Sequence, residues 1–357
     1  MALDSSAQQE RRKLTKKVRL EWSINLTKYT SFLRQKMNKI SITYLGKFNT
    51  EEHTIEKDVR DELIKMGHKV SSIDDKDFDP KQVIELANKS DLFLFRTGGV
   101  VTDNVGDFHL TLNRLQYTLQ EINTKKVFWF FDKVIGLGNN WIFNIEPLVD
   151  IGFLNDETFL RRHHTDKLYP LHLGVFSGSV YNGNHNKDFA YDVAFNGPIY
   201  GTRKVFIDVM RETFGNNFGV FNVQDDKQFA DLCASAKIIV SPRFPYDDWF
   251  WSERFYKTIG HGGFLVFPRL EGLKDEGFED GVNYVGYDVY GEMIETIKWW
   301  LDPANEKAKE GMEIIPKRGM EMVRLNHTYD RKLQFLLDIT FKRYEGKGIT
   351  KRNQLQR

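Results

Sequence analysis

Cysteine and long apolar runs are nearly absent from this sequence. Its 357 residues include a single cysteine, Cys233, so an internal disulfide is excluded and a reducing cytoplasm is expected. No apolar run approaches the roughly 20 residues of a membrane span. The basic N-terminus has no apolar core after it, unlike a secretory signal. With 41% hydrophobic and 28% charged residues, the composition is typical of a soluble globular protein.

Signature motifs of several enzyme classes are also missing. The sequence has no G-x-x-x-x-G-K-[ST] phosphate loop, no G-x-S-x-G elbow and no H-E-x-x-H zinc motif. Gly136 to Gly138 begin like a dinucleotide fingerprint, but Trp141 stands where its third glycine belongs. Asp75, Asp77 and Asp79 precede a proline, which favours a solvated turn over a metal-diphosphate site. We therefore expect neither a nicotinamide cofactor nor a bound metal.

Charge is distributed unevenly although the net charge is only +1. Residues 1–39 contain ten Lys or Arg and three Asp or Glu, and residues 342–357 contain six and one. The segment between them is therefore acidic. Basic ends suit contact with nucleic acid or another polyanion. Solvated termini without such a partner fit the same pattern.

The pattern along the chain predicts four regions. Residues 1–38 form a basic arm with helical spacing of apolar residues, and residues 39–175 alternate short apolar strands with helices. A Gly/Ser/Asn-rich stretch over 173–187 is the best candidate for a flexible linker. A second alternating series fills residues 176–325, followed by a C-terminal helix and basic tail over 326–357.

Repeated strand–helix–strand units predict parallel sheets with helices on both faces. The fold class is therefore α/β, with two doubly wound Rossmann-like domains. Ligands of such sheets bind beyond the carboxyl ends of the strands, so we expect the site in the cleft between the domains.

The segment AYDVAFNGPIYGTRKVF, residues 190–206, has the features of a diphosphate-binding loop. A strand ends at Gly197, and Tyr200 and Gly201 lead to Arg203 at the start of the next helix. Glycine lets a ligand approach the backbone, and a helix N-terminus and an arginine both attract anions. A plain turn with an exposed arginine is the alternative.

The segment WSERFYKTIGHGGFLVFP, residues 251–268, combines a short cationic helix with a glycine-rich end. Trp251, Phe255 and Ile259 repeat at intervals of four and predict a core stripe. Arg254 and Lys257 lie on a neighbouring face, so both are candidates to contact one phosphate group.

Local alternatives exist for two residues beside these cations. Glu253 precedes Lys257 by four residues, in the favourable order for a helical ion pair, and this reading of Lys257 is as well supported as the phosphate reading. Ser252 can cap the helix.

Four residues of the first domain follow its predicted strands and are candidates for acceptor binding. They are Gly46, Gly98, Gly99 and Asp132. Asp132 is a candidate general base, although an ordinary turn or N-cap aspartate is the more common reason for such a residue.

Residues 190–340 resemble the CgeB-like glycosyltransferases, a GT-B-fold group related to the group 1 glycosyltransferases. The first domain agrees with that group only in architecture. The resemblance rests on several spaced motifs, with matches at Trp251, Ser252, Arg254, Tyr256, Gly260, Gly262, Gly263, Gly272, Asp280, Gly281, Asp288, His327, Thr328, Tyr329 and Arg331.

The resemblance implies transfer of a sugar from a nucleotide-sugar co-substrate to an acceptor, with retention of configuration and without metal. Arg254, Arg203 and Lys257 are then expected to stabilise the departing diphosphate, and Tyr256, Gly262 and Gly263 to shape the nucleotide pocket. Lys257 departs from the family, which has an acidic residue there that is expected to hold ribose or sugar hydroxyls. Either Glu253 replaces that carboxylate, or the donor is held more through phosphate.

The acceptor is left open by the sequence. A hydroxymethylated DNA base, a polysaccharide and a protein all fit. Two other functions also stay open: a nucleotide-sugar- or nucleic-acid-binding protein with a decayed site, and a nucleotide-sugar epimerase.

Overall fold

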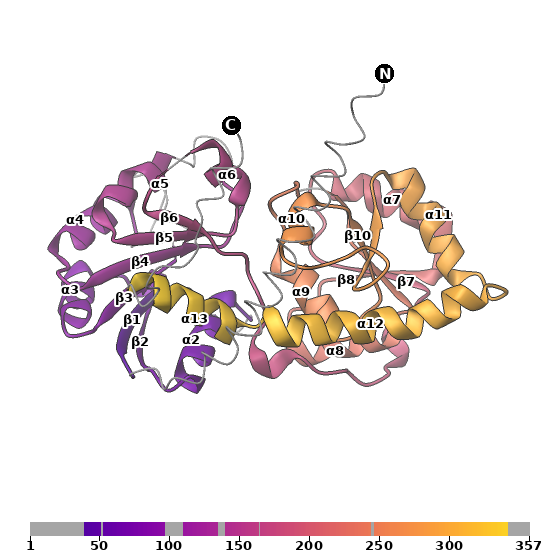
Figure 1. The fold of residues 1–357 in the computed structure, drawn as a ribbon, viewed down its shortest axis with the longest axis horizontal. Coiled ribbons are helices and arrows are strands. Elements are labelled where there is room, and N and C mark those ends of the chain that lie inside the picture. Colours follow the sequence, from indigo (N-terminus) through magenta and orange to yellow (C-terminus); the bar gives the residue numbers. More distant parts are fainter. Residues whose placement is uncertain are drawn as a thin grey trace, which may run out of the picture. The chain divides into compact units, whose positions relative to one another are not determined.

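The computed structural model describes residues 39–50, 53–96, 110–134, 140–163, 165–243 and 246–341. Two parallel β-sheets with helices on their faces make up this part of the chain (Figure 1). The described residues from Ile40 onward cluster as one compact unit. The expected pair of doubly wound α/β domains is confirmed.

The first sheet has six strands in the order β2-β1-β3-β4-β5-β6, and each neighbouring pair is parallel. Its strands are β1 (Ser41–Gly46), β2 (Lys69–Asp74), β3 (Leu92–Phe95), β4 (Lys125–Phe130), β5 (Ile151–Leu154) and β6 (Leu168–Pro170). The helices between them are α2 (Ile55–Lys65), α3 (Pro80–Asn88), α4 (Leu112–Glu121), α5 (Asn140–Ile145) and α6 (Glu157–Arg162).

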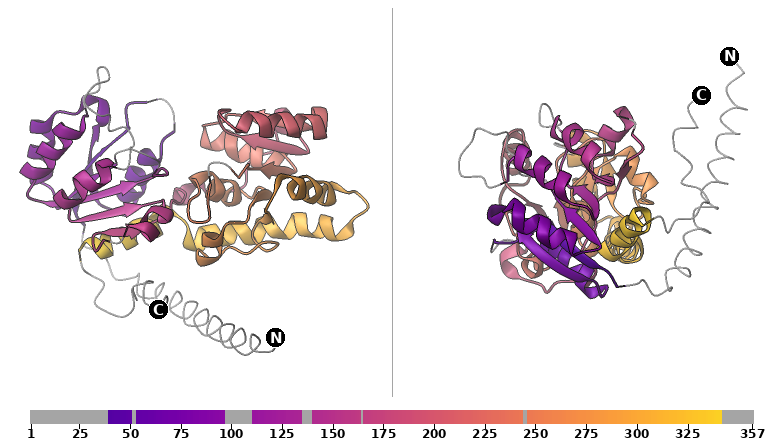
Figure 2. Two further views of the ribbon diagram at one scale, coloured as in Figure 1. Left: turned by 90° about the horizontal axis from the view of Figure 1, so that it is seen from above. Right: turned by 90° about the vertical axis from the view of Figure 1, so that its left-hand side faces the viewer.

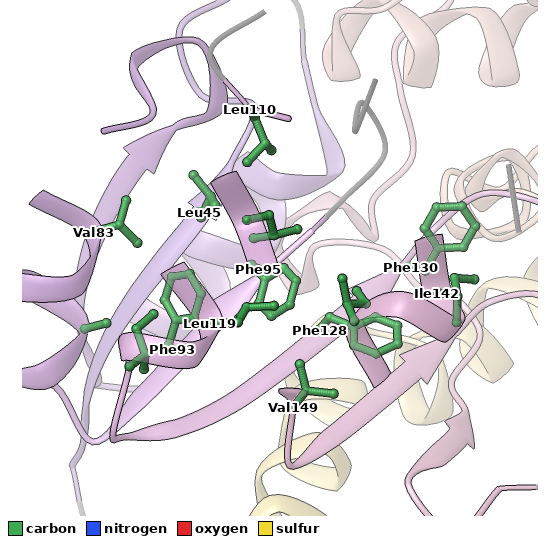
Figure 3. Close-up of a cluster of buried hydrophobic side chains, with 14 of the residues drawn as sticks. Leu45, Val83, Phe93, Phe95, Leu110, Leu119, Phe128, Phe130, Ile142 and Val149 are labelled. Atoms are coloured by element: carbon green, nitrogen blue, oxygen red, sulfur yellow. The ribbon is translucent and has the colours of Figure 1, made fainter. Parts of the chain in front are cut away.

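Aromatic residues of the central strands form much of the first core (Figure 3). The rings of Phe93 and Phe95 stack with centroids 5.3 Å apart, and Phe95 lies 6.0 Å from Phe128 of the next strand. All three are fully buried. Because helices cover both faces of this sheet, its central strands are apolar on both sides, which explains the continuous run LFLF in β3.

The second sheet has five parallel strands in the order β11-β10-β9-β7-β8. They are β7 (Val193–Asn196), β8 (Phe218–Phe221), β9 (Ile238–Val240), β10 (Leu265–Pro268) and β11 (Val285–Tyr287). The accompanying helices are α7 (Arg203–Phe214), α8 (Asp226–Ser235), α9 (Glu253–Gly260), α10 (Glu271–Asp275) and α11 (Tyr290–Leu301). Seen from above, these helices flank the second sheet on both faces (Figure 2).

The expected strands and helices of both series are present, but two strands of the first sheet were not predicted. Strands β5 and β6 are only four and three residues long, and β6 ends at Pro170. Such short strands carry too few residues for a clear alternating pattern.

The segment 173–187 connects the two sheets, as predicted for the linker, and hydrogen bonds tie it to both domains. Ser177 donates from its backbone N–H and its hydroxyl to Glu62 of α2, each at 2.7 Å. Farther along, the N–H groups of Asn184 and Asn186 bond to Asp231 and Ser235 of α8.

Two helices complete the fold, α12 (Glu306–Asn326) and α13 (Tyr329–Thr340). Helix α12 packs against α9 of the second domain, whereas α13 packs against α2 of the first domain (Figure 1). The helix expected after His327 is therefore present and returns the chain to the first domain. None of the helices described is long and apolar enough to cross a membrane.

Asn155, directly after β5, joins three segments that surround the carboxyl ends of the strands. Its buried side-chain amide donates to the carbonyl oxygens of Phe131 (3.0 Å) and Trp251 (2.9 Å), and its oxygen accepts from the N–H of Leu173 (3.1 Å). One side chain thus satisfies three backbone groups.

Replacing Asn155 with Ala should strongly destabilise the protein. Each buried backbone group left unsatisfied costs about 1–3 kcal/mol, so we expect a loss of at least about 3 kcal/mol. Urea denaturation followed by circular dichroism measures this loss. Asn216→Ala, at an exposed position, is the control and should change little. Equal midpoints for the two variants would contradict the role of Asn155.

Candidate functional site

A pocket of about 210 Å³, open to solvent, is lined by residues that follow strands of both sheets. From the first domain come His53, Ile55, Phe131, Asp132 and Leu173. The second domain contributes Asn196, Gly197, Val223, Gln224, Asp226, Phe229, Phe250, Ser252, Glu253, Arg254 and Lys257. The pocket therefore lies at the carboxyl ends of parallel strands, where ligands of such folds bind.

Six of the predicted site residues line this single pocket: Asp132, Gly197, Ser252, Glu253, Arg254 and Lys257. Four of them, Ser252 to Arg254 and Lys257, belong to the start of α9, whose N-terminal turn faces the pocket. The hydroxyl of Ser252 contacts the hydroxyl of Tyr246 at 3.0 Å and makes no capping bond to α9. First-turn N–H groups of the helix thus lack a side-chain cap.

Arg254 lies against Gly197, the residue after β7. Gly197 has φ +148°, and a Cβ built there would meet the guanidinium carbon of Arg254 at 3.0 Å. Glycine is needed for both the backbone angle and the close approach. Within the described ranges, the guanidinium of Arg254 has neither a hydrogen bond nor an ion pair. A half-buried cation without a counterion thus faces the pocket.

Arg203 is not a lining residue of this pocket, although it begins α7 as predicted. Its side chain is buried; Nη1 donates to the carbonyl oxygen of Pro198 at 3.0 Å, and the guanidinium covers the ring of Tyr200. Burial and the charge of Arg254 together lower the pKa of Arg203. The two arginines are therefore close enough to repel each other, which an anion between them would relieve.

Lys257 bridges the two domains inside the pocket wall. Its Nζ lies 3.1 Å from Nδ1 of His53, 3.7 Å from Oε1 of Glu253 and 3.9 Å from Oδ2 of Asp58. The side chain is almost fully buried. The expected ion pair with Glu253 is present, and the ammonium group has further partners in the first domain. The ammonium group is therefore held by partners from both domains.

His53 connects Lys257 to Asp58. Its Nε2 lies 2.7 Å from Oδ1 of Asp58, and its Nδ1 lies 3.1 Å from Nζ of Lys257. Burial and the charge of Lys257 oppose protonation of His53. The hydrogen bond that the ring donates to Asp58 and the negative charges of Asp58 and Glu253 outweigh them, so the pKa of His53 is raised.

Asp132 lies on the first-domain side of the pocket and is exposed. Its Oδ2 accepts from Nη2 of Arg96 at 3.0 Å, and Arg96 also pairs with Glu56 of α2. The carboxylate is therefore fixed in direction while it remains accessible. Gly46 ends β1 beside Glu56 and does not line the pocket.

Other predicted residues lie away from the pocket. Tyr256 is fully buried between Phe278 and His327. Gly262 and Gly263 lie at the far end of α9, packed against Asn182 and Thr258. Tyr200 and Gly201 belong to the loop before α7 and are exposed. Gly98 and Gly99 lie outside the described residues.

Sequence reasoning missed His53, Asn196 and Asp226. Asn196 ends β7, and Asp226 comes shortly after β8, so the rule that selects residues beyond carboxyl strand ends would have found both. His53 carries no such signal, because its partner Lys257 is 204 residues away in the chain.

Comparison with known families bears directly on this part of the chain. Residues 197–338 match the glycosyl transferase-like family. The matched span includes α9 and the whole second-domain wall of the pocket from Gly197 onward. It agrees with the region of the glycosyltransferase resemblance; the CgeB-like subgroup remains a prediction. No curated protein matches the chain.

Solved structures with the same fold cover most of the chain. HepE of Anabaena, in complex with UDP and glucose, has a TM-score of 0.60 at 10% identity, over 85% of this chain and 100% of that chain. An α-glucosyltransferase in complex with UDP and a 13-mer DNA containing an HMU base has a TM-score of 0.60 at 12% identity and the same coverage. These similarities identify the fold as GT-B.

Replacing His53 with Gln should destabilise the protein in a pH-dependent way. Because the folded-state pKa is raised, the protonated ring stabilises the fold below about pH 6.5, and this contribution is lost as the pH rises through the folded value. The drop in Tm should therefore be larger at pH 5.5 than at pH 8.5. His185→Gln, at an exposed position, is the control. A drop that grows with pH would contradict this assignment.

Proposed function

We propose that this protein is a glycosyltransferase that moves a sugar from a nucleotide-sugar to an acceptor hydroxyl. The observation that carries this proposal is the position of Arg254, which lies against Gly197 in the pocket with no counterion among the described residues. An unpaired cation in a half-buried site is costly unless a ligand supplies the anion.

The chemistry of the transfer suits this arrangement. As the bond between sugar and diphosphate breaks, negative charge builds on the departing phosphate and the sugar becomes cation-like. Fixed cations near that phosphate stabilise the transition state more than the ground state. Arg254 has this role in our proposal. The buried guanidinium of Arg203 adds a second positive charge near it, and the first turn of α9, which has no side-chain cap, adds N–H donors.

We further propose that the reaction proceeds with retention and without metal. Arginines replace the charge that a metal would supply at the diphosphate. Within the described ranges, no group of three or more His, Cys, Asp and Glu side chains is placed to hold a metal ion. Asp132, held by Arg96, faces the pocket from the acceptor side and would orient the acceptor hydroxyl.

Arg254→Ala should lower kcat/KM for sugar transfer by about 10²–10³-fold, because one charge-stabilising donor is worth about 2.7–4 kcal/mol in the transition state. UDP-glucose is the first donor to test, since HepE and the α-glucosyltransferase were solved with UDP-sugars. Release of UDP measures the rate. Arg211→Ala, on the exposed side of α7, is the matched control. Unchanged kinetics for the Arg254 variant would remove the basis of the proposal.

DNA carrying a hydroxymethylated base is the acceptor that we propose first. The basic residues of 1–39 and 342–357 favour a polyanion, and the α-glucosyltransferase of the same fold was solved with DNA containing an HMU base. A polysaccharide or a protein would accept through the same pocket.

Removing residues 1–38 should weaken binding to a 13-mer DNA containing HMU and flatten its salt dependence, because fewer counterions are then released. Affinity for UDP should stay the same. Binding is measured by fluorescence anisotropy at several salt concentrations. If the truncated and the full-length chain bind DNA equally, the acceptor assignment is wrong.

The same assays separate the two other functions. Tight binding of UDP-glucose without turnover of any acceptor is the result expected of a decayed site. Conversion of the donor sugar without an acceptor is the result expected of an epimerase.

A further inference from the structure

We propose that Asp226 binds a pair of neighbouring hydroxyl groups on the nucleotide-sugar, and that His261 holds its carboxylate in place. This inference rests on the proposed function. Arg254 would bind the negatively charged phosphate, whereas the hydroxyls of a sugar need a hydrogen-bond acceptor.

Asp226 is free to bind a ligand because the capping role belongs to its neighbour. Asp225 is the N-cap of α8, and its side chain accepts from the N–H of Gln228 at 2.8 Å. Asp226 follows as the first residue of the helix, lines the pocket and keeps 22% of its side chain exposed. A small ligand in the pocket can therefore reach its carboxylate.

His261 holds the carboxylate of Asp226 in place. Nε2 of His261 lies 3.2 Å from Oδ1 of Asp226, and Nδ1 lies 3.1 Å from the carbonyl oxygen of Tyr181. The His261 side chain is fully buried. Both ring nitrogens thus face oxygen acceptors. The histidine between Gly260 and Gly262 is explained by this contact.

Tyr181 adds a second donor, because its hydroxyl lies 3.3 Å from Oδ2 of Asp226. Burial and the charge of Asp226 raise the pKa of Tyr181 to about 12, so the hydroxyl keeps its hydrogen. Although burial opposes ionisation of Asp226, the hydrogen bonds from His261 and Ser179 and nearby positive charges lower its pKa to about 2. The carboxylate is therefore ionised at any working pH.

An ionised carboxylate has about four lone-pair positions, and these donors leave some of them for a ligand. It repels phosphate but accepts hydrogen bonds from two adjacent hydroxyls, one for each oxygen. Lys257, in the same pocket, cannot accept a hydrogen bond. Glu253 is the competing acceptor: its Oε1 lies 3.7 Å from Nζ of Lys257, and its buried Oε2 has no hydrogen-bond partner among the described residues.

Two parts of a nucleotide-sugar carry neighbouring hydroxyls: the ribose and the transferred sugar. Three probes distinguish them, namely UDP, 2′-deoxy-UDP and UDP-glucose. Calorimetric titration of the full-length protein gives Kd for each probe, and the same titrations are made with Asp226→Asn and with Glu253→Gln as the matched comparison.

We expect Asp226→Asn to weaken binding by about 10- to 100-fold, the usual effect of a lost hydrogen bond to a charged group. If ribose is bound, the unmutated protein prefers UDP over 2′-deoxy-UDP, and the variant loses that preference. If the transferred sugar is bound, the variant loses affinity for UDP-glucose alone. Either pattern supports the proposal.

Unchanged Kd values for all three probes in a folded Asp226→Asn variant would overturn the proposal, as would the same losses in Glu253→Gln instead. If the unmutated protein prefers UDP over 2′-deoxy-UDP and the Asp226→Asn variant keeps that preference, Asp226 does not bind the ribose. Failure of the proposed function looks different: the unmutated protein then binds none of the three probes, nor GDP or ADP.

His261 is a positioning residue in this scheme, and its test uses the ratio of affinities rather than stability. His261→Ala should reduce the discrimination that depends on Asp226, and His261→Gln should restore part of it, because the glutamine amide can donate to the carboxylate. If both variants keep full discrimination while their Tm falls, His261 is only structural.

Discussion

The site depends first on the buried amide of Asn155. The amide donates to two backbone carbonyl oxygens from different domains: that of Phe131, which follows β4 of the first sheet, and that of Trp251, which precedes α9 of the second domain. The N–H of Leu173, which it also binds, belongs to the connection between the sheets. Phe131 and Leu173 line the pocket, and Ser252 and Arg254 follow Trp251 closely. A single hydrogen-bonded side chain thus positions both walls of the pocket.

Charge is sorted within the pocket. On one side, Arg254 lies against the backbone at Gly197 without a counterion, with Arg203 buried nearby. Elsewhere in the wall, Lys257 is bound by His53 and Glu253, and Asp226 is bound by His261. Because a buried charge is stable only when it is compensated, the uncompensated one indicates where an anionic part of a ligand belongs. The compensated groups keep their orientation whether or not a ligand is present.

Sequence patterns predicted the local features of this site but not its long-range contacts. Glycine after β7 and the cationic turn at the start of α9 were recognised because their neighbours in sequence are also their neighbours in space. The contact of Lys257 with His53 joins positions 204 residues apart, and no spacing rule reaches that far. Burial of Arg203 was missed for a related reason, since the ring of Tyr200 and the carbonyl of Pro198 enclose it only in the folded loop.

Other errors were avoidable from helix geometry alone. Residues two apart on an α-helix point about 200° from each other, so Tyr256 cannot share a face with Arg254, and it lies in the core beside Phe278. Gly262 and Gly263 follow Arg254 by two turns and lie beyond the opposite end of α9. The motif in this segment is therefore a structural unit with two separate ends. The first turn of α9 faces the pocket, and His261, the residue after the helix, contacts the pocket residue Asp226.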